Sequence, residues 1–444
     1  MTSAGAFLGS AKSRLLPASV PFRFFVAAQA CHILLWLALI IAAADFTRFR
    51  GGTGPALASV HLLTIGVLTL TAIGAAVQLL PVATVKPLAA VWPIRLAFWL
   101  LLPGVAALIA GMAIVDVTLM IGGALACTLG LGLFAALLAA NLRRAGSMPV
   151  VSAYGWAAFG SPILLVALGV ALALDNSSGF LSDHAGVALA HMILGGLGFM
   201  GMLALGFSHI LVPMFALSNS PKTSLAWSGF VAALAAIVLG VAGALLAVNA
   251  LLITACMVGV IAAALHLWLM QTVLTNGMRK RLGLSFVLVR VSWAMLALTP
   301  LIGIAALQGW AGEGAPTLFG LIMLGGWLMT FLFGVLQRIL PFLASMHVTR
   351  ASGGPPLLTD LGGATPLRIH AACHLAALAG LAVAIAIDNP LLAAGAALIG
   401  FGGALAFAAY VGGILKALVA APVPRPTEQG ARHVRQSHQP DPAR

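Results

Sequence analysis

Twelve long apolar runs, nearly free of charge, constrain this chain more than any other feature. Hydrophobic residues make up 62% of the sequence and charged residues only 7%, whereas a soluble domain carries roughly 25% charged residues. The runs suit helices that cross a bilayer and are too long for barrel strands. We predict an all-α polytopic membrane protein, surrounded by lipid, with spans near residues 22–44, 56–80, 93–113, 115–140, 153–174, 185–213, 225–248, 250–273, 283–308, 316–343, 368–387 and 390–418.

The basic residues fall on one side of this topology. If the N-terminus is cytoplasmic, 20 of the 22 Lys and Arg lie in inner segments, and only Arg48 and Arg50 lie outside. The positive-inside rule then predicts that both termini are cytoplasmic. The net charge of +13 suits an anionic inner leaflet and gives no reason to expect a nucleic-acid partner. Around the membrane domain, 22–418, we expect a cytoplasmic segment at 1–21 and a disordered basic tail at 419–444.

One frame occurs three times in the apolar runs: Gly, seven residues, Gly, six residues, Pro. The copies are Gly66–Gly74–Pro81, Gly198–Gly206–Pro213 and Gly326–Gly334–Pro341. They fall in spans 2, 6 and 10, so the repeating unit is four helices long. A chance match is the alternative, because Gly and Pro are common in membrane helices. The constant interval favours three arcs of four helices, with the frame helices around a shared axis.

The residues of the frame have separate expected roles. Glycines let a neighbouring backbone or a flat ligand come close to a helix. Each proline is expected to end its helix at the inner surface.

The arcs and their histidines resemble a known family. Twelve spans in three arcs, histidines on the second and sixth spans, and "LVPMF" at the end of the sixth are similar to subunit I of the haem–copper oxidase superfamily over roughly residues 20–420. The divergent branch with NnrS-like proteins is the more similar one. In two places the chain departs from the oxidases: Leu321 to Pro341 lacks their His-x-His, and the seventh span lacks their His-His pair.

This resemblance implies a cofactor and a class of chemistry. It implies b-type haem, with copper as a second cofactor, in the inner membrane of a bacterium. The haem would be non-covalent, since the sequence contains no CxxCH motif. The implied activity is an oxidoreductase or ligand-binding role toward a small gas such as nitric oxide or oxygen, with an electron donor as partner.

Histidines are the candidate ligands, because a polar side chain within lipid is costly and usually functional. His61 and His191 begin matching spans of two arcs, and neutral imidazole is a common haem and copper ligand. We predict that this pair holds a haem or metal near the outer face, with Gly66 and Gly198 leaving room for the macrocycle. The alternative is a pair of core histidines bonded to neighbouring carbonyls.

Six further histidines are candidate metal ligands. In "HAACH", His370 and His374 have the i, i+4 spacing that places two imidazoles on one helical face; the alternative is a pair at a helix start facing the cytoplasm. His184 follows an outer loop and is either a ligand or solvated. The whole set is His32, His184, His209, His266, His370 and His374.

The acidic residues are informative through their positions. All nine lie in loops, at span edges or in the tail, whereas proton pumps usually place a titrating carboxylate within the membrane. We therefore expect a non-pumping protein. The alternative function is a cofactor-free secondary transporter or permease, a class in which twelve spans and internal repeats are also common. Three copies in one orientation, within continuous spans, favour the oxidase-like hypothesis.

Overall fold

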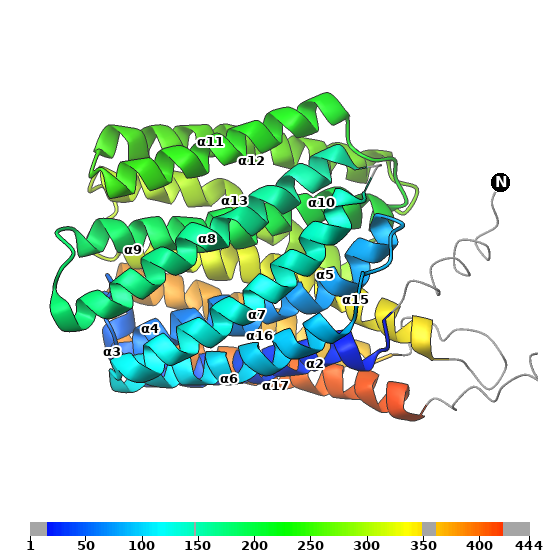
Figure 1. Cartoon of the computed structure of the whole chain (residues 1–444), viewed down its shortest axis with the longest axis horizontal. Coiled ribbons are helices and arrows are strands. Elements are labelled where there is room, and N and C mark those ends of the chain that lie inside the picture. The colour runs from blue at the N-terminus through cyan, green and yellow to red at the C-terminus, as the bar shows by residue number, and fades with distance from the viewer. Residues whose placement is uncertain (1–15, 146–147, 349–360, 421–444) are drawn as a thin grey trace, which may run out of the picture.

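The computed structural model describes residues 16–145, 148–348 and 361–420. All regular structure in these ranges is helical, and twelve helical spans are long and apolar enough to cross a membrane. Figure 1 shows the long helices lying side by side along the long axis of the molecule, with short connections at both ends. The predicted fold class is confirmed. The expected flanking segments lie mostly outside the described residues.

Most spans are single helices, and their bounds agree with the predicted runs to within a few residues. They are α2 (Ser19–Ile41), α6 (Trp92–Ile114), α7 (Val117–Arg143), α8 (Pro149–Ser178), α11 (Thr223–Leu245), α12 (Asn249–Asn276), α13 (Gly283–Leu307), α16 (Ala364–Ala386) and α17 (Pro390–Ala420), with the short α3 (Ala43–Phe46) after α2.

Spans 2, 6 and 10 differ from the others because each contains a π-helical segment. Span 2 is α4 (Pro55–His61), η1 (Leu62–Thr69) and α5 (Leu70–Ala83); span 6 is α9 (His184–Ile193), η2 (Leu194–Gly201) and α10 (Met202–Ala216); span 10 is α14 (Ala315–Gly320), η3 (Leu321–Met329) and α15 (Thr330–His347). Each π-helical segment contacts the other two. The three spans that carry the sequence frame therefore meet along the centre of the bundle.

The frame glycines explain how each central span packs. In every copy both glycines face the preceding span, and a Cβ added to them would lie 2.7–3.0 Å from a side-chain atom there. The pairs are Gly66–Cys31, Gly74–Phe24, Gly198–Ser161, Gly206–Tyr154, Gly326–Met295 and Gly334–Val289. Close approach of small residues is a main source of helix packing in lipid. The first and second spans of all three arcs thus pack by the same device.

The third and fourth spans of each arc form antiparallel hairpins. These are α6 with α7, α11 with α12, and α16 with α17, the three most extensive helix pairs in the structure. In Figure 1, α11 and α12 lie along one edge of the bundle and α6 and α17 along the opposite edge. A central span with its glycine contacts and an outer hairpin recur in each arc, which matches the predicted four-helix unit.

The prolines of the frame do not end their helices as expected. Pro81, Pro213 and Pro341 lie inside α5, α10 and α15, which continue to Ala83, Ala216 and His347. A proline cannot donate the hydrogen bond to the preceding turn, but the residues after it can still be helical. The prediction placed the helix ends two to six residues too early.

Candidate functional site

The predicted pair His61 and His191 is brought together where two central spans begin their π-helical segments. His61 is the last residue of α4, directly before η1, and His191 lies in α9, three residues before η2. The two imidazole rings have centroids 6.2 Å apart and planes inclined by 31°. Both side chains are half-buried. π-helical turns occur often at functional sites, because they re-aim side chains at the point of insertion.

Backbone carbonyls fix the state of both rings. His61 Nδ1 lies 3.1 Å from the Leu57 carbonyl oxygen, and His191 Nδ1 lies 2.9 Å from that of Leu165. A carbonyl oxygen only accepts, so each Nδ1 carries the proton and each neutral ring keeps its lone pair on Nε2. Such a hydrogen bond behind the ring is the usual support of a metal-ligating histidine. The alternative of carbonyl-bonded core histidines describes the same bonds, so both interpretations share these contacts.

The space at Gly66 and Gly198 is not open for a macrocycle. Cys31 of α2 fills the side-chain position of Gly66, and Ser161 of α8 fills that of Gly198. The glycines serve the packing of spans 1 and 5 against spans 2 and 6. The two glycines therefore let the neighbouring helices approach. They do not provide the room that we predicted for a bound macrocycle.

A second group joins His32 of α2 to His370 and His374 of α16. The ring centroid of His370 lies 5.9 Å from that of His32 and 5.6 Å from that of His374. All three are buried, with 0% to 2% exposure. Phe333 and Phe407 pack against His370 with centroids 4.6 and 4.7 Å away. The HAACH histidines share one face as predicted, but they do not face the aqueous side.

A third group joins His209 of α10 to His266 of α12. Their ring centroids are 5.9 Å apart. Tyr154 of α8 stacks on His209 at 5.6 Å, with an interplanar angle of 29°. His266 is 3% exposed, and its Nδ1 has no hydrogen-bond partner. The sequence presented these histidines as single residues on separate spans; neither their pairing nor Tyr154 was predicted.

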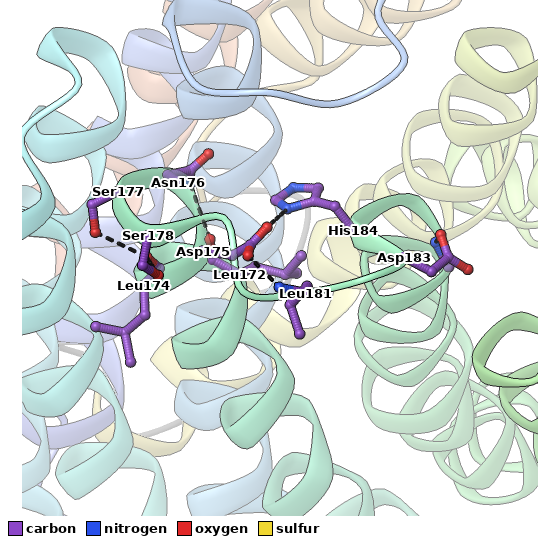
Figure 2. A network of polar contacts seen from close by, with 10 residues as sticks. Leu172, Leu174, Asp175, Asn176, Ser177, Ser178, Leu181, Asp183 and His184 are labelled. Atoms are coloured by element: carbon purple, nitrogen blue, oxygen red, sulfur yellow. Dashed lines mark hydrogen bonds and ion pairs between the residues drawn. The ribbon is translucent and has the colours of Figure 1, made fainter.

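His184 belongs to a local network at the connection between α8 and α9. Its Nδ1 lies 2.7 Å from Asp175 Oδ2, and the backbone N–H of Leu181 donates to Asp175 Oδ1 at 2.6 Å. Figure 2 shows the imidazole and the Asp175 carboxylate pointing toward one another across this turn. Asp183 begins α9 by accepting a hydrogen bond from Gly186 N at 2.8 Å. These contacts order the turn, and His184 is not part of any of the three histidine groups.

The candidate ligands thus form groups of two or three histidines in different parts of the bundle. In the part of the chain that the structure describes, no cluster of three or more His, Cys, Asp and Glu side chains is arranged to hold one metal ion. His61 and His191 connect the first arc to the second. His32, His370 and His374 connect the first arc to the third. His209 and His266 lie within the second arc.

Comparison with known proteins supports the fold. A haem–copper terminal oxidase dimer solved by cryo-electron microscopy matches with a TM-score of 0.61 at 11% sequence identity, over 93% of this chain and 86% of that chain. No family model and no curated protein matches the sequence. The resemblance inferred from the three arcs is therefore confirmed at the level of the fold.

Proposed function

We propose that this chain is a haem-binding integral membrane protein of haem–copper oxidase type, with copper as a second cofactor. The observation that carries the proposal is the neighbouring pair His61 and His191. In each ring, Nδ1 donates its proton to a backbone carbonyl, so the lone pair of Nε2 is available to bind a metal. The shared fold supports the class. The NnrS-like branch, with nitric oxide or oxygen as the ligand, is the finer assignment that we propose.

The ring separation suits one metal ion held by two histidines, although Cys31 and Ser161 close the space at Gly66 and Gly198. An imidazole nitrogen binds a metal at about 2 Å, so two rings sharing one ion have centroids about 6 Å apart when they lie in line. The observed separation is 6.2 Å. Imidazole is a ligand of both haem iron and copper. A bound haem or copper would supply a site for a small gas ligand and for one-electron transfer.

The protein's own contribution is orientation. The carbonyls of Leu57 and Leu165 hold both Nε2 atoms in the form that can bind a metal. Gly169 lets the His191 ring lie against α8, since a Cβ there would be 2.9 Å from His191 Cε1. Holding ligands through such outer contacts stabilises metal binding.

We propose that the activity is that of an oxidoreductase or gas-binding protein that does not pump protons. The described acidic residues lie in loops, at helix ends or in the short α3: Asp45, Asp116, Asp175, Asp183, Glu313 and Asp388. A pump that relies on a buried carboxylate needs one near mid-membrane. The placement of these residues offers none.

The test is the absorption spectrum and metal content of protein purified from haem-replete cells. We expect a Soret band with extractable b-type haem, and its loss or shift in His61→Ala and in His191→Ala. His433→Ala, in the tail beyond the described residues, should leave the spectrum unchanged. Protein with copper but no haem would restrict the proposal to a copper site. A colourless, copper-free protein would overturn it and favour the transporter.

A further inference from the structure

The buried group His32, His370 and His374 lies apart from the proposed cofactor pair and has its own chemistry. Four of its six ring nitrogens have no hydrogen-bond partner: His32 Nδ1, His370 Nδ1, His370 Nε2 and His374 Nδ1. Buried polar atoms are rarely left unpaired, because each one costs free energy when it is removed from water. Four such atoms in one group therefore indicate a ligand with matching hydrogen-bonding capacity.

The first end of the group has a defined protonation. Trp36 Nε1 lies 3.0 Å from His32 Nε2. An indole N–H only donates, so His32 Nε2 accepts. The proton of the neutral His32 ring is then on Nδ1, which makes this unpaired nitrogen a donor.

At the other end of the group, the unpaired nitrogen is a hydrogen-bond acceptor. Thr330 Oγ1 donates to the Gly325 carbonyl at 2.9 Å and lies 2.8 Å from His374 Nε2. A hydroxyl has one proton, so both contacts are hydrogen bonds only if His374 Nε2 donates to Thr330. The unpaired His374 Nδ1 therefore carries a lone pair and is an acceptor.

His370 lies between these two ends. A neutral imidazole offers one donor and one acceptor, so the four unpaired nitrogens comprise two donors and two acceptors. We infer that His32, His370 and His374 form one neutral hydrogen-bond relay completed by ordered water, and that this group is a water site and not a second metal site. The relay connects α2 of the first arc to α15 and α16 of the third.

Metal coordination matches these atoms less well than water does. A metal ion binds lone pairs only, so it would leave the N–H of His32 and one N–H of His370 without acceptors. No carboxylate belongs to the group, and Cys373 faces away, with its Cβ near Gly403 of α17. Water, which both donates and accepts, satisfies all four nitrogens.

The structure also provides space for water beside the relay. A cavity of about 10 Å³ reaches the His32 end of the group: it is lined by His32, Gln29 and Thr71 and by apolar side chains of spans 1, 2, 10 and 12, whereas His370 and His374 do not line it. A single water needs roughly 10–15 Å³ on this scale and two or more polar partners. The rings form no direct hydrogen bonds with one another, since none of the four nitrogens has a hydrogen-bond partner.

The first test measures the proton positions by nitrogen NMR on full-length protein labelled with 15N-histidine. Signals are assigned with His32→Phe and His374→Phe. We expect His32 to carry its proton on Nδ1 and His374 on Nε2, both neutral, with water exchange cross-peaks to the group. A proton on His32 Nε2, or a metal-shifted His374 Nδ1, would overturn the relay.

The second test measures copper bound per protein after copper titration. His370→Phe should leave the copper content unchanged, whereas a metal site here requires it to fall by about one ion. His370→Asn retains one donor and one acceptor and is the matched variant. A loss of copper in both variants would establish a metal site and refute the water site. If neither variant folds, the nitrogen NMR of the unmodified chain decides alone.

Discussion

Gly66 lies against Cys31 so closely that no methyl group fits between spans 2 and 1. A Cβ built on Gly66 would be 2.7 Å from Cys31 Cβ and 2.9 Å from its Sγ, whereas one on Gly122 of α7 would have no neighbour within 4 Å. The same substitution should therefore have opposite effects at these two glycines.

We predict that Gly66→Ala lowers stability and that Gly122→Ala does not. Overpacking a tight helix contact costs about 1–3 kcal/mol, while alanine is favoured over glycine in a helix by about 1 kcal/mol. Thermal unfolding in detergent should show a lower midpoint for Gly66→Ala and an equal or higher one for Gly122→Ala. Equal midpoints for both variants would contradict the packing role of the frame.

Tyr154 supports both its stacked partner His209 and the contact with Gly206. Tyr154→Phe keeps the ring and should have little effect, because Tyr154 makes its observed contacts through the ring and Cβ. Tyr154→Ala removes a buried aromatic side chain, for which losses of about 3–5 kcal/mol are typical. Denaturant or thermal unfolding of the two variants should separate these effects. A large loss in Tyr154→Phe would mean that the hydroxyl has a partner of its own.

An acid-sensitive contact joins two connections at one end of the bundle. Thr47 Oγ1 donates to Asp388 Oδ1 at 2.8 Å, and Arg48 forms an ion pair with the same carboxylate. The hydrogen bond from Thr47 lowers the pKa of Asp388 below its usual value, and the contact with Arg48 lowers this pKa further. The folded state therefore binds this proton less readily than the unfolded state.

This contact should make stability depend on acid pH. The stabilisation is fully present above the unfolded Asp pKa, about 3.9, and is lost as the pH falls through the lower folded value. Asp388→Asn should be less stable at neutral pH, with the difference shrinking toward pH 3. The measurement is the unfolding midpoint from pH 3 to 7, with Asp45→Asn as the control. A constant difference across this range would contradict the prediction.

The orientation of the chain remains a prediction from charge. Because 20 of 22 basic residues gather on one side in the twelve-span topology, reporter fusions after Lys86 and after Arg444 should both report the cytoplasm. A periplasmic signal from either fusion would contradict the predicted orientation.

The sequence predicted the spans and the arcs because lipid imposes long apolar runs, and because repeated glycines mark repeated close contacts. It also placed His370 and His374 on one face through their spacing. It missed their burial, since α16 begins at Ala364, four residues before the predicted start, so His370 lies well inside the helix.

The contacts between spans that are distant in the sequence were harder to predict from the sequence. His209 and His266 are 57 residues apart, and their approach depends on how α10 and α12 pack. The π-helical segments also left no signal in the apolar pattern, because one inserted residue per turn changes the register without changing composition.

The three π-helical segments bear on the ancestry of the chain. They occupy corresponding positions, each enclosing the first glycine of its frame: Gly66 in η1, Gly198 in η2 and Gly326 in η3. Three independent insertions at one place are a less economical history than a single insertion in a four-helix ancestor that was later triplicated. On this account the π-helical segment is older than the division into arcs. Only two of the three spans carry a histidine shortly before the π-helical segment, His61 directly before η1 and His191 three residues before η2, so a symmetric scaffold holds an asymmetric pair.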